Sequence, residues 1–364
     1  MINDKTIAVV VPCYNEETQI QMVIENMPEF VDRIIIVNDN STDDTSKIVL
    51  KLINSNKFKS PIKIDSPKVI PNFYNKAEQV LEEKNDSEIK NFTPHDIVKN
   101  TDFKNKIILI NHNQNAGVGA AIATGYKWCK DKAIDCTAVM AGDGQMDPSE
   151  LKSICLPVIE EGIDYVKGNR LIHRSAWLVI PKIRYFGNSI LSILTKLASG
   201  YWHVSDTQTG YTAISKKAIN SIRLYDIYKS YGMPNDILVK LNIAFCTLRE
   251  VEIKPVYQIG EQSKMKIFKV IPRVSWLLIK SFFKRLWIKY LFRDFHPLFL
   301  LYNFSFILFI VWAPYLIKIS KSLIYTFENS FETLFAFTFL GISAFQSFLF
   351  AMYMDIQDNE RQYK

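Results

Sequence analysis

The chain has 364 residues, of which 48% are hydrophobic, and its 44 Lys and Arg exceed its 37 Asp and Glu by seven charges. This apolar content excludes a disordered or low-complexity protein, and the length suffices for one large domain or two smaller ones. Five cysteines lie far apart without a Cys-x-x-Cys pair, which favours a reducing compartment over a disulfide framework or a zinc site. The N-terminus shows no basic stretch before an apolar run, so we expect no signal peptide.

Short apolar runs alternate with helical patterns in the first 150 residues. Strands are predicted at 6–12, 33–37, 107–110 and 137–140, and helices at 17–27 and about 117–130. This alternation predicts an α/β domain with a mainly parallel sheet. Such sheets bind ligands at the carboxyl ends of their strands.

Polar side chains follow three of these predicted strands. Tyr14-Asn15-Glu16 follows the first, Asn38-Asp39 the second, and Gly142-Asp143-Gly144-Gln145 the fourth. A carboxylate such as that of Asp39 can accept hydrogen bonds from the base or ribose of a nucleoside. The alternative for Asp39 is a helix N-cap or a turn, because Ser, Thr and Asp follow it at 41–43.

The segment Asn115-Ala116-Gly117-Val118-Gly119 opens a predicted helix with small residues. Small residues would let the backbone approach a ligand that carries phosphate. The glycine spacing is that of neither a P-loop nor a dinucleotide-binding fingerprint, so an ATPase and a dehydrogenase are not favoured.

Asp143 and Gln145 place two oxygen ligands on a tight glycine turn. Hard oxygen ligands suit Mg²⁺ or Mn²⁺ held jointly by the protein and a diphosphate. The alternative is an Asp-Gly turn without any ligand.

Residues 54–106 interrupt the α/β pattern. The stretch is polar, contains three prolines, and has one predicted helix around 74–83. It is longer than an ordinary connection, which predicts a surface insertion.

The excess positive charge lies in residues 266–293, which contain no acidic residue. The basic residues there are Lys266, Lys269, Arg273, Lys280, Lys284, Arg285, Lys289 and Arg293. Without these eight, 36 basic residues face 37 acidic ones. Aromatic and aliphatic residues lie between the basic ones, which is typical of an amphipathic helix on an anionic membrane surface. The alternative is a solvated helix face.

Two uncharged stretches follow, at 298–317 and 333–354. Each has the roughly 20 residues that a helix needs to cross a bilayer, and the alternative is a pair of buried core helices. Basic residues crowd the side that precedes the first stretch, so the positive-inside rule places the N-terminal domain in the cytoplasm. The expected organisation is a domain over 1–265, juxtamembrane helices over 266–296, and a transmembrane hairpin with a short tail over 297–364.

In chain order, several motifs resemble family 2 glycosyltransferases with the Rossmann-like GT-A fold, and among these the polyprenyl-phosphate (dolichyl-phosphate) sugar synthases. The motifs are Pro12-Cys13-Tyr14-Asn15-Glu16-Glu17, Val37-Asn38-Asp39-Asn40-Ser41-Thr42-Asp43, Asn115-Ala116-Gly117, Gly142-Asp143-Gly144-Gln145-Met146-Asp147-Pro148, Gly168-Asn169-Arg170, Arg184, Asp206 to Tyr211 and Ser263-Lys264. The resemblance covers about residues 5 to 265.

The resemblance implies roles for the matched residues. Nucleotide contacts are implied near Pro12, Tyr14, Glu16 and Asp39, and metal contacts at Asp143 and Gln145. Arg170 and Arg184 would receive the acceptor phosphate, and Lys264 would lie near the diphosphate. From the chemistry of their side chains, Asp206 is a candidate for orienting the acceptor or sugar and Asp236 for contacting the sugar, with helix capping as the alternative for Asp236. Asn115 and Gly117 complete the candidate nucleotide site.

Two departures from the family pattern affect these expectations. Ala141 stands where the metal motif of the family has its first acid, and Thr212 stands where a basic residue is often found. The chain also lacks a Gln-x-x-Arg-Trp sequence, which argues against a processive polysaccharide synthase.

We therefore expect a membrane-anchored, metal-dependent glycosyltransferase that moves a sugar from a UDP- or GDP-sugar to polyprenyl phosphate on the cytoplasmic leaflet. The resemblance implies an inverting displacement. The alternatives are an enzyme with another lipid or glycan acceptor and an inactive scaffold that binds sugar nucleotides. We expect no nucleic-acid partner, because the rest of the chain is near neutral. The sequence is compatible with a homo-oligomer.

Overall fold

The computed structural model describes residues 1–55, 57–60, 62, 64, 66, 69–98, 105–256, 267–325 and 329–364. Its central element is an eight-stranded sheet in the order β3-β4-β2-β1-β5-β7-β6-β8. The strands are β1 (Ile7–Cys13), β2 (Arg33–Asn38), β3 (His95–Ile97), β4 (Ile107–His112), β5 (Cys136–Val139), β6 (Tyr165–Asn169), β7 (Thr212–Ser215) and β8 (Leu248–Glu252). The pairs β1–β2, β1–β5, β2–β4 and β6–β8 are parallel, and β3–β4, β5–β7 and β6–β7 are antiparallel.

The central strands form because their side chains are apolar, largely β-branched, and buried on both faces. Strands β1 and β2 read IAVVVPC and RIIIVN, and every residue in both is buried. In their parallel register Val10 lies opposite Ile35, and Cys13 lies opposite Asn38. The carboxyl ends of β1 and β2 therefore meet at the same edge of the sheet.

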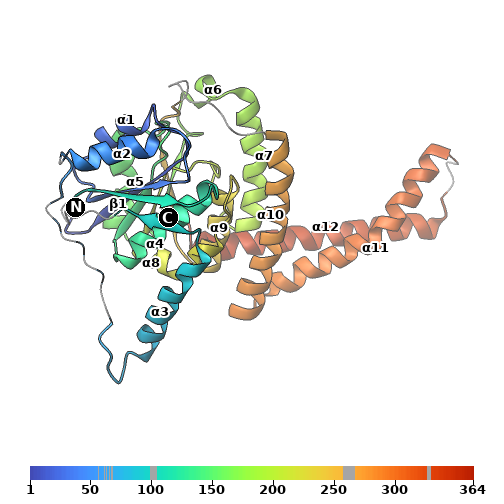
Figure 1. Cartoon of the computed structure of the whole chain (residues 1–364). Helices are drawn as coiled ribbons and strands as arrows, with labels where there is room; N and C mark the ends of the chain where they lie inside the picture. Colours follow the sequence, from blue (N-terminus) through green and yellow to red (C-terminus); the bar gives the residue numbers. More distant parts are fainter. Residues whose placement is uncertain are drawn as a thin grey trace.

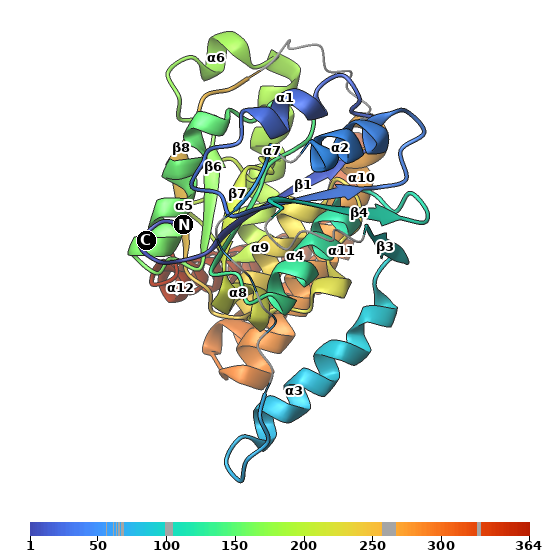
Figure 2. The ribbon, with the colours of Figure 1, turned by 60° about the vertical axis from the view of Figure 1, so that its left-hand side comes forward.

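Helices cover both faces of the sheet (Figures 1 and 2). One hydrophobic core packs α1 (Ile20–Glu25), α2 (Thr45–Asn54) and α5 (Leu151–Glu160) on one face. A second core packs α4 (Val118–Asp131), α8 (Lys216–Ser221) and α9 (Met233–Ile243) on the other. Short 3-10 turns lie at η1 (Glu88–Asn91), η2 (Pro148–Glu150) and η3 (Leu224–Asp226). The expected α/β domain with a mainly parallel sheet is confirmed.

Part of the insertion expected at 54–106 projects from the domain. Helix α3 (Lys76–Ser87) extends away from the sheet in both views and has no buried residue (Figures 1 and 2). It begins and ends later than the helix expected at 74–83. The chain returns from α3 through η1 to β3, which lies at the edge of the sheet beside β4.

The remaining helices lie on the other side of the domain. They are α6 (Ala176–Val179), α7 (Lys182–Ser199), α10 (Ile267–Trp287) with its π-helical extension η4 (Ile288–Arg293), α11 (Pro297–Tyr325) and α12 (Phe331–Glu360). Helices α7 and α10 lie side by side, and α11 and α12 form a hairpin that projects from them (Figure 1). The hairpin axis runs across the long axes of α7 and α10.

Helices α11 and α12 are long and apolar enough to cross a membrane. They are not core helices of the domain, because few of their apolar side chains are buried; Ile310 is 73% exposed and Phe335 is 61% exposed. Inside the hairpin, Ser305 Oγ donates to the carbonyl oxygen of Ala344, and Trp312 Nε1 donates to that of Phe337. Two long apolar helices that pack against each other and leave much of their apolar surface exposed are typical of a membrane anchor.

The expectation that the whole basic stretch 266–293 lies on the membrane surface is wrong for two residues. Arg285 and Lys289 are buried, with 1% and 0% of their surface exposed. The physical reason is that α12 supplies Asp355 and Asp358, which pair with them. Arg273, Lys280 and Lys284 are exposed among apolar residues such as Trp276, so an amphipathic surface remains on α10.

Candidate functional site

Two loops at the carboxyl ends of β1 and β2 are bound to each other. The backbone N–H of Asn15 donates to Ser41 Oγ at 3.0 Å, and the N–H of Thr42 donates to Asn15 Oδ1 at 2.8 Å. The N–H of Glu16 donates to Thr45 Oγ1 at 2.9 Å. Asn15 has φ 55°, a left-handed conformation that Asn tolerates better than most residues. The loop that contains Tyr14 and Glu16 is therefore held in one conformation.

Asp39 lies at the centre of this edge and is 3% exposed. Its Oδ1 accepts from His112 Nδ1 at 2.7 Å and from the N–H of Ala116 at 2.9 Å, and its Oδ2 accepts from the N–H of Gly117 at 2.7 Å. Burial alone would raise the pKa of Asp39, but these hydrogen bonds outweigh it and lower the pKa. The Asp39 carboxylate thus connects β2, β4 and the start of α4, and it does not cap the helix that follows it.

The glycines of Asn115-Ala116-Gly117-Val118-Gly119 have a structural explanation that sequence reasoning missed. A Cβ on Gly117 would lie 2.4 Å from the carbonyl oxygen of Lys229, and one on Gly119 would lie 2.0 Å from that of Tyr228. Gly117 also has φ +95°. The close approach that requires glycine is therefore that of the 228–230 loop. The side chain of Asn115 is exposed at the same edge.

The turn after β5 carries Asp143 and Gln145. Asp143 Oδ1 accepts from the N–H of Gln145 at 3.0 Å, and Gly144 has φ 77°. A Cβ on Gly142 would lie 2.7 Å from Cys13 Sγ, so glycine is needed there to seat the turn against β1. Burial raises the pKa of the Cys13 thiol, and the nearby carboxylates of Glu16 and Asp143 add to this. The structure thus brings the β1 loop and the Asp143 turn together.

Arg170 and Asp206 form a second part of the site, beyond the end of β6. Arg170 Nε and Nη2 donate to the two oxygens of Asp206 at 2.8 and 3.1 Å. The Asp206 side chain is 0% exposed and that of Arg170 is 22% exposed. Burial would raise the pKa of Asp206, but the Arg170 ion pair and hydrogen bonds outweigh it and lower the pKa. This bidentate pair fixes the plane of the guanidinium.

Glu250 on β8 accepts hydrogen bonds from the backbone of the Asp206 loop and from Asn169, next to Arg170. Its Oε1 accepts from the N–H of Asp206 at 3.0 Å, and its Oε2 accepts from the N–H of Ser205 at 2.9 Å and from Asn169 Nδ2 at 2.8 Å. Lys167 Nζ, which is fully buried, donates to the carbonyl oxygen of Thr209 in the same loop. Burial lowers the pKa of Lys167, while Asp206 and Glu250 oppose that shift.

The other residues with expected roles lie as follows. Pro12 is buried in β1, and its carbonyl oxygen accepts from the N–H of Gly142 at 3.3 Å. Tyr14 is 37% exposed at the sheet edge. Arg184 lies in the first turn of α7, where only its backbone position is described. Lys264 lies outside the described residues. Asp236 accepts from the N–H of Tyr228 and pairs with Lys240.

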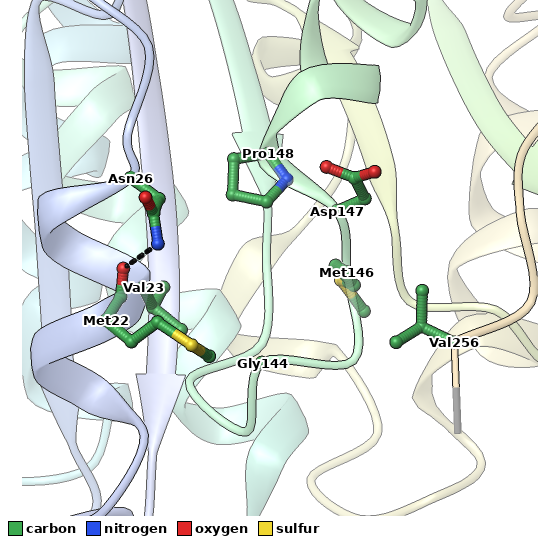
Figure 3. A pocket seen from close by; sticks show the side chains of 8 residues that line it. All are labelled: Met22, Val23, Asn26, Gly144, Met146, Asp147, Pro148 and Val256. Carbon is green, nitrogen blue, oxygen red and sulfur yellow. Dashed lines mark hydrogen bonds between the residues drawn. The ribbon is translucent and has the colours of Figure 1, made fainter. Parts of the chain in front are cut away.

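A cavity of about 250 Å³ lies between α1 and the turn after β5 (Figure 3). It is lined by Met22, Val23, Asn26, Gly144, Met146, Asp147, Pro148 and Val256. Asn26 Nδ2 donates to the carbonyl oxygen of Met22, and Asp147 Oδ1 accepts from the N–H of Ser149. The cavity is mostly apolar, and none of the residues expected to contact substrate lines it.

The comparison with protein families identifies the chain. The sequence model of glycosyl transferase family 2 matches residues 8–68 and 85–223, more than half of the chain. The chain belongs to glycosyltransferase family 2. The match spans the loops after β1, β2, β4 and β5 and the Asp206 loop, and it omits 69–84, which includes the first turns of α3. The GT-A architecture that the resemblance implied is confirmed.

Two curated relatives align with 70% of this glycosyltransferase. It is 31% identical over 260 residues to UDP-N-acetylglucosamine–dolichyl-phosphate N-acetylglucosaminyltransferase of Methanococcus voltae, covering 70% of this chain and 87% of that one. It is 26% identical over 258 residues to an uncharacterised protein of Methanocaldococcus jannaschii, covering 70% and 84%. A solved structure, Mycobacterium tuberculosis glucosyl-3-phosphoglycerate synthase with UDP, matches at 19% identity and TM-score 0.44 over 78% of this chain and 80% of that one.

The ligands that this glycosyltransferase offers to a divalent cation are few. Within the described part of the chain, no group of three or more His, Cys, Asp and Glu side chains could hold a metal ion. Ala141 removes one carboxylate from the turn, which leaves Asp143 and Gln145. Mg²⁺ is commonly bound by one or two carboxylates together with substrate phosphates and water. The residues therefore fit a cation that arrives with a diphosphate and do not form a complete cage.

Sequence reasoning missed His112, Glu250 and Lys167. Each is a polar residue in or at the end of a strand: His112 ends β4, Glu250 lies in the partly buried β8, and Lys167 lies in the fully buried β6. A buried charged residue in a strand needs a partner, and that requirement was the available signal. The partners lie 73 residues from His112 and 44 from Glu250, so pairing could not be deduced from spacing.

Replacement of His112 by phenylalanine is expected to lower the free energy of unfolding by about 1–3 kcal/mol, because it removes a donor from the buried Asp39 carboxylate while keeping an aromatic ring at that position. Nucleotide binding should weaken as well, since Asp39 positions the 115–117 turn. Thermal unfolding and calorimetric UDP binding measure the two effects. His95→Phe, on the edge strand β3, is the control; equal effects of both variants would contradict the role of His112.

Acid should destabilise this glycosyltransferase through Asp39 and Asp206. Both folded-state pKa values lie below the usual 3.8, so the stability that they contribute is present above that value and is lost as pH falls through the folded-state pKa values. We expect the melting temperature to decrease as the pH is lowered below about 4. Asp39→Asn should show a flatter dependence than the wild type. Parallel curves for the two proteins would show that Asp39 contributes nothing to the acid sensitivity.

Proposed function

We propose that this glycosyltransferase is a membrane-anchored, metal-dependent enzyme that transfers a sugar from a UDP-sugar to polyprenyl or dolichyl phosphate. The observation that carries the proposal is a series of bonds from the apolar hairpin α11–α12 to the loop of Asp206. Arg285 of α10 binds both Asp355 of α12 and the carbonyl oxygens at the end of α7, and Ser192 of α7 donates to the carbonyl oxygen of Ser205. A lipid phosphate reaches an enzyme from the bilayer surface, so its binding site must lie close to that surface. The Methanococcus voltae relative is named for dolichyl phosphate as its acceptor, which supports the same acceptor class.

The donor is proposed to be a UDP-sugar because the Asp39 carboxylate has only one hydrogen-bond-accepting position left for a base. A carboxylate has about four such positions, and protein N–H groups occupy three of them. Guanine presents two adjacent N–H donors, N1 and N2, which need both carboxylate oxygens. Uracil presents the single N3–H, which matches the one position that remains. The Methanococcus voltae relative is named as using UDP-N-acetylglucosamine.

The proposed chemistry is a single displacement. A lipid phosphate is ionised near neutral pH, so its oxygen attacks the sugar C1 without a general base. The bond from C1 to the diphosphate oxygen breaks, its electron pair stays on the diphosphate, and attack from the opposite side inverts the configuration. Arg170, oriented by Asp206, and Arg184 would hold the acceptor phosphate. Asp143 and Gln145 would hold a divalent cation, which neutralises charge on the leaving diphosphate. Lys264 would act near the same group.

The orientation in the membrane is part of the proposal. If the hairpin crosses the bilayer, α7 and α10 lie along its surface, because the hairpin axis runs across theirs (Figure 1). Exposed Arg273 and Lys280 would then lie at the level of anionic headgroups. The concentration of basic residues before α11 favours a catalytic domain on the cytoplasmic side.

A donor panel tests the proposal. The full-length protein in vesicles with polyprenyl phosphate is incubated with labelled UDP-N-acetylglucosamine, UDP-glucose or GDP-mannose, with Mg²⁺ or Mn²⁺ or with EDTA. We expect a lipid-extractable product with at least one UDP-sugar and none with EDTA. Absence of product with every donor would overturn the proposal. Product formed only when a lipid-linked sugar replaces polyprenyl phosphate would support the alternative acceptor.

A further inference from the structure

The end of α12 returns to the catalytic domain and joins its sheet. The N–H of Leu248 donates to the carbonyl oxygen of Gln362 at 2.7 Å, and the N–H of Lys364 donates to that of Leu248 at 2.9 Å. Tyr363 thereby forms a parallel bridge with the first residue of β8. The last residues of the chain thus extend the sheet at its β8 edge, where β8 is the outermost of the described strands.

A buried ion pair lies beside this junction. Arg285 of α10 donates through Nη1 and Nη2 to the two oxygens of Asp355 at 2.8 and 2.7 Å. The same guanidinium donates to the carbonyl oxygens of Leu197 and Ala198, at the end of α7, at 3.0 Å each. The Arg285 and Asp355 side chains are 1% and 0% exposed. One arginine therefore binds α7, α10 and α12 together.

Lys289 makes a second buried connection one turn further along. Its Nζ donates to Asn242 Oδ1 in α9 at 3.1 Å and to Gln362 Oε1 at 2.8 Å. It also pairs with Asp358 at 3.4 Å. Asn359 Nδ2 donates to Asp355 Oδ1 at 2.7 Å, which joins the two connections. The last turns of α12 are thus bonded to α9 directly and to α7 through Arg285, and the residues after α12 are bonded to β8.

These connections lead to both arginines that we assign to the acceptor phosphate. Helix α7, whose last carbonyl groups bind Arg285, carries Arg184 in its first turn. Strand β8, which pairs with the chain end, carries Glu250, and Glu250 binds the backbone of Asp206, the partner of Arg170. The end of α12 is therefore linked to each arginine by a continuous series of bonded or rigid elements.

We propose that Arg285 and Asp355 are positioning residues that set the acceptor site at a fixed place relative to the membrane anchor. The inference rests on the proposed acceptor function. A buried ion pair seldom adds net stability compared with apolar residues, but removing one partner is costly, so such pairs can specify one geometry. A site that receives a headgroup from a bilayer needs such a fixed geometry, because small displacements of a reacting group reduce rates steeply.

Gly200 offers a variant that leaves every charge in place. It ends α7 with φ +79°, and a Cβ on it would lie 2.5 Å from Arg285 Nη1 and 3.1 Å from Asn359 Nδ2. Gly200→Ala would displace the guanidinium without changing the ion pair chemically. Arg285→Lys keeps the positive charge but loses the bidentate geometry, and Asp355→Asn removes the negative charge.

The test compares two acceptors for the full-length protein. One is long-chain polyprenyl phosphate in phospholipid vesicles, and the other is a short-chain prenyl phosphate that is soluble in water. For all three variants we expect kcat/KM with the vesicle acceptor to fall about 10- to 100-fold. With the soluble acceptor we expect kcat/KM and the donor KM to stay within about twofold of wild type. Asp131→Asn, which breaks the Lys127–Asp131 pair on α4, is the matched control and should affect neither acceptor.

Two results would contradict the positioning role of Arg285 and Asp355. Equal losses with both acceptors would show that the ion pair only supports folding, and unchanged rates with both would show that it positions nothing; either result overturns the proposal. Melting temperatures identify variants that fail to fold, and Gly200→Ala then serves as the decisive variant. If the wild type uses neither prenyl phosphate as acceptor, the proposed function is wrong, and the positioning role, which rests on it, is wrong as well.

Discussion

Replacement of Asp143 by alanine is expected to reduce sugar transfer by about 10³-fold. Asp143 is the only carboxylate among the two residues that the turn after β5 offers to a cation, because Ala141 stands where the family has its first acid. Few other ligands can compensate, since the described residues contain no cluster of three or more metal-binding side chains. Transfer to polyprenyl phosphate at saturating Mn²⁺ measures the effect.

Binding measurements separate a lost cation from a damaged fold. Titration calorimetry should show that Mn²⁺ binds the wild type appreciably only when UDP is present, because the diphosphate completes the coordination. Asp143→Ala should lose this UDP-dependent Mn²⁺ binding while keeping its melting temperature. Glu161→Gln, at the opposite end of β6, is the control and should behave like the wild type. Full transfer by Asp143→Ala would remove Asp143 from the metal site.

Replacement of Asp206 by asparagine is expected to lower the free energy of unfolding by about 3–5 kcal/mol. The variant leaves Arg170 without its buried carboxylate, and it leaves Lys167 beside one carboxylate instead of two. Transfer should be lost together with stability, because the guanidinium plane of Arg170 is set by Asp206. The melting temperature and transfer to polyprenyl phosphate report the two effects.

An exposed pair of the same chemistry provides the comparison for Asp206. Arg249 and Glu161 also form an arginine–carboxylate ion pair, but their side chains are 28% and 49% exposed. Solvent screens such pairs, so Glu161→Gln should leave the melting temperature nearly unchanged. A similar loss in both variants would mean that burial is not what makes the Asp206 pair important.

The sequence predicted the class of the fold correctly because the signals are local. Apolar β-branched runs at 6–12 and 33–37 are typical of buried strands, and the helical pattern between them indicates a crossover connection. Because these strands are parallel, their carboxyl ends place Tyr14, Asp39 and Asp143 on one edge of the sheet, independently of the loop conformations. The two uncharged stretches in the last seventy residues predicted helices α11 and α12 for the same reason.

The partners of the polar residues could not be predicted from the sequence. Asp39 was expected to contact a nucleotide or cap a helix; in the structure its carboxylate binds His112 and the 116–117 backbone, and the nucleotide contact stays a prediction. Gly117 was expected to admit a phosphate, and the space beside it is occupied by the carbonyl oxygen of Lys229. Each of these contacts joins residues more than 70 positions apart in the chain, so it could not be deduced from local sequence.

The net charge illustrates the same division between sequence and structure. The sequence by itself determined that the excess of seven positive charges belongs to one amphipathic stretch before two apolar helices, because charge and hydropathy are properties of each residue. Only the tertiary structure decided that two residues of that stretch, Arg285 and Lys289, are buried and pair with carboxylates near the end of α12. A basic side chain is solvated or buried according to whether a distant segment brings it a carboxylate, and that depends on the folded chain.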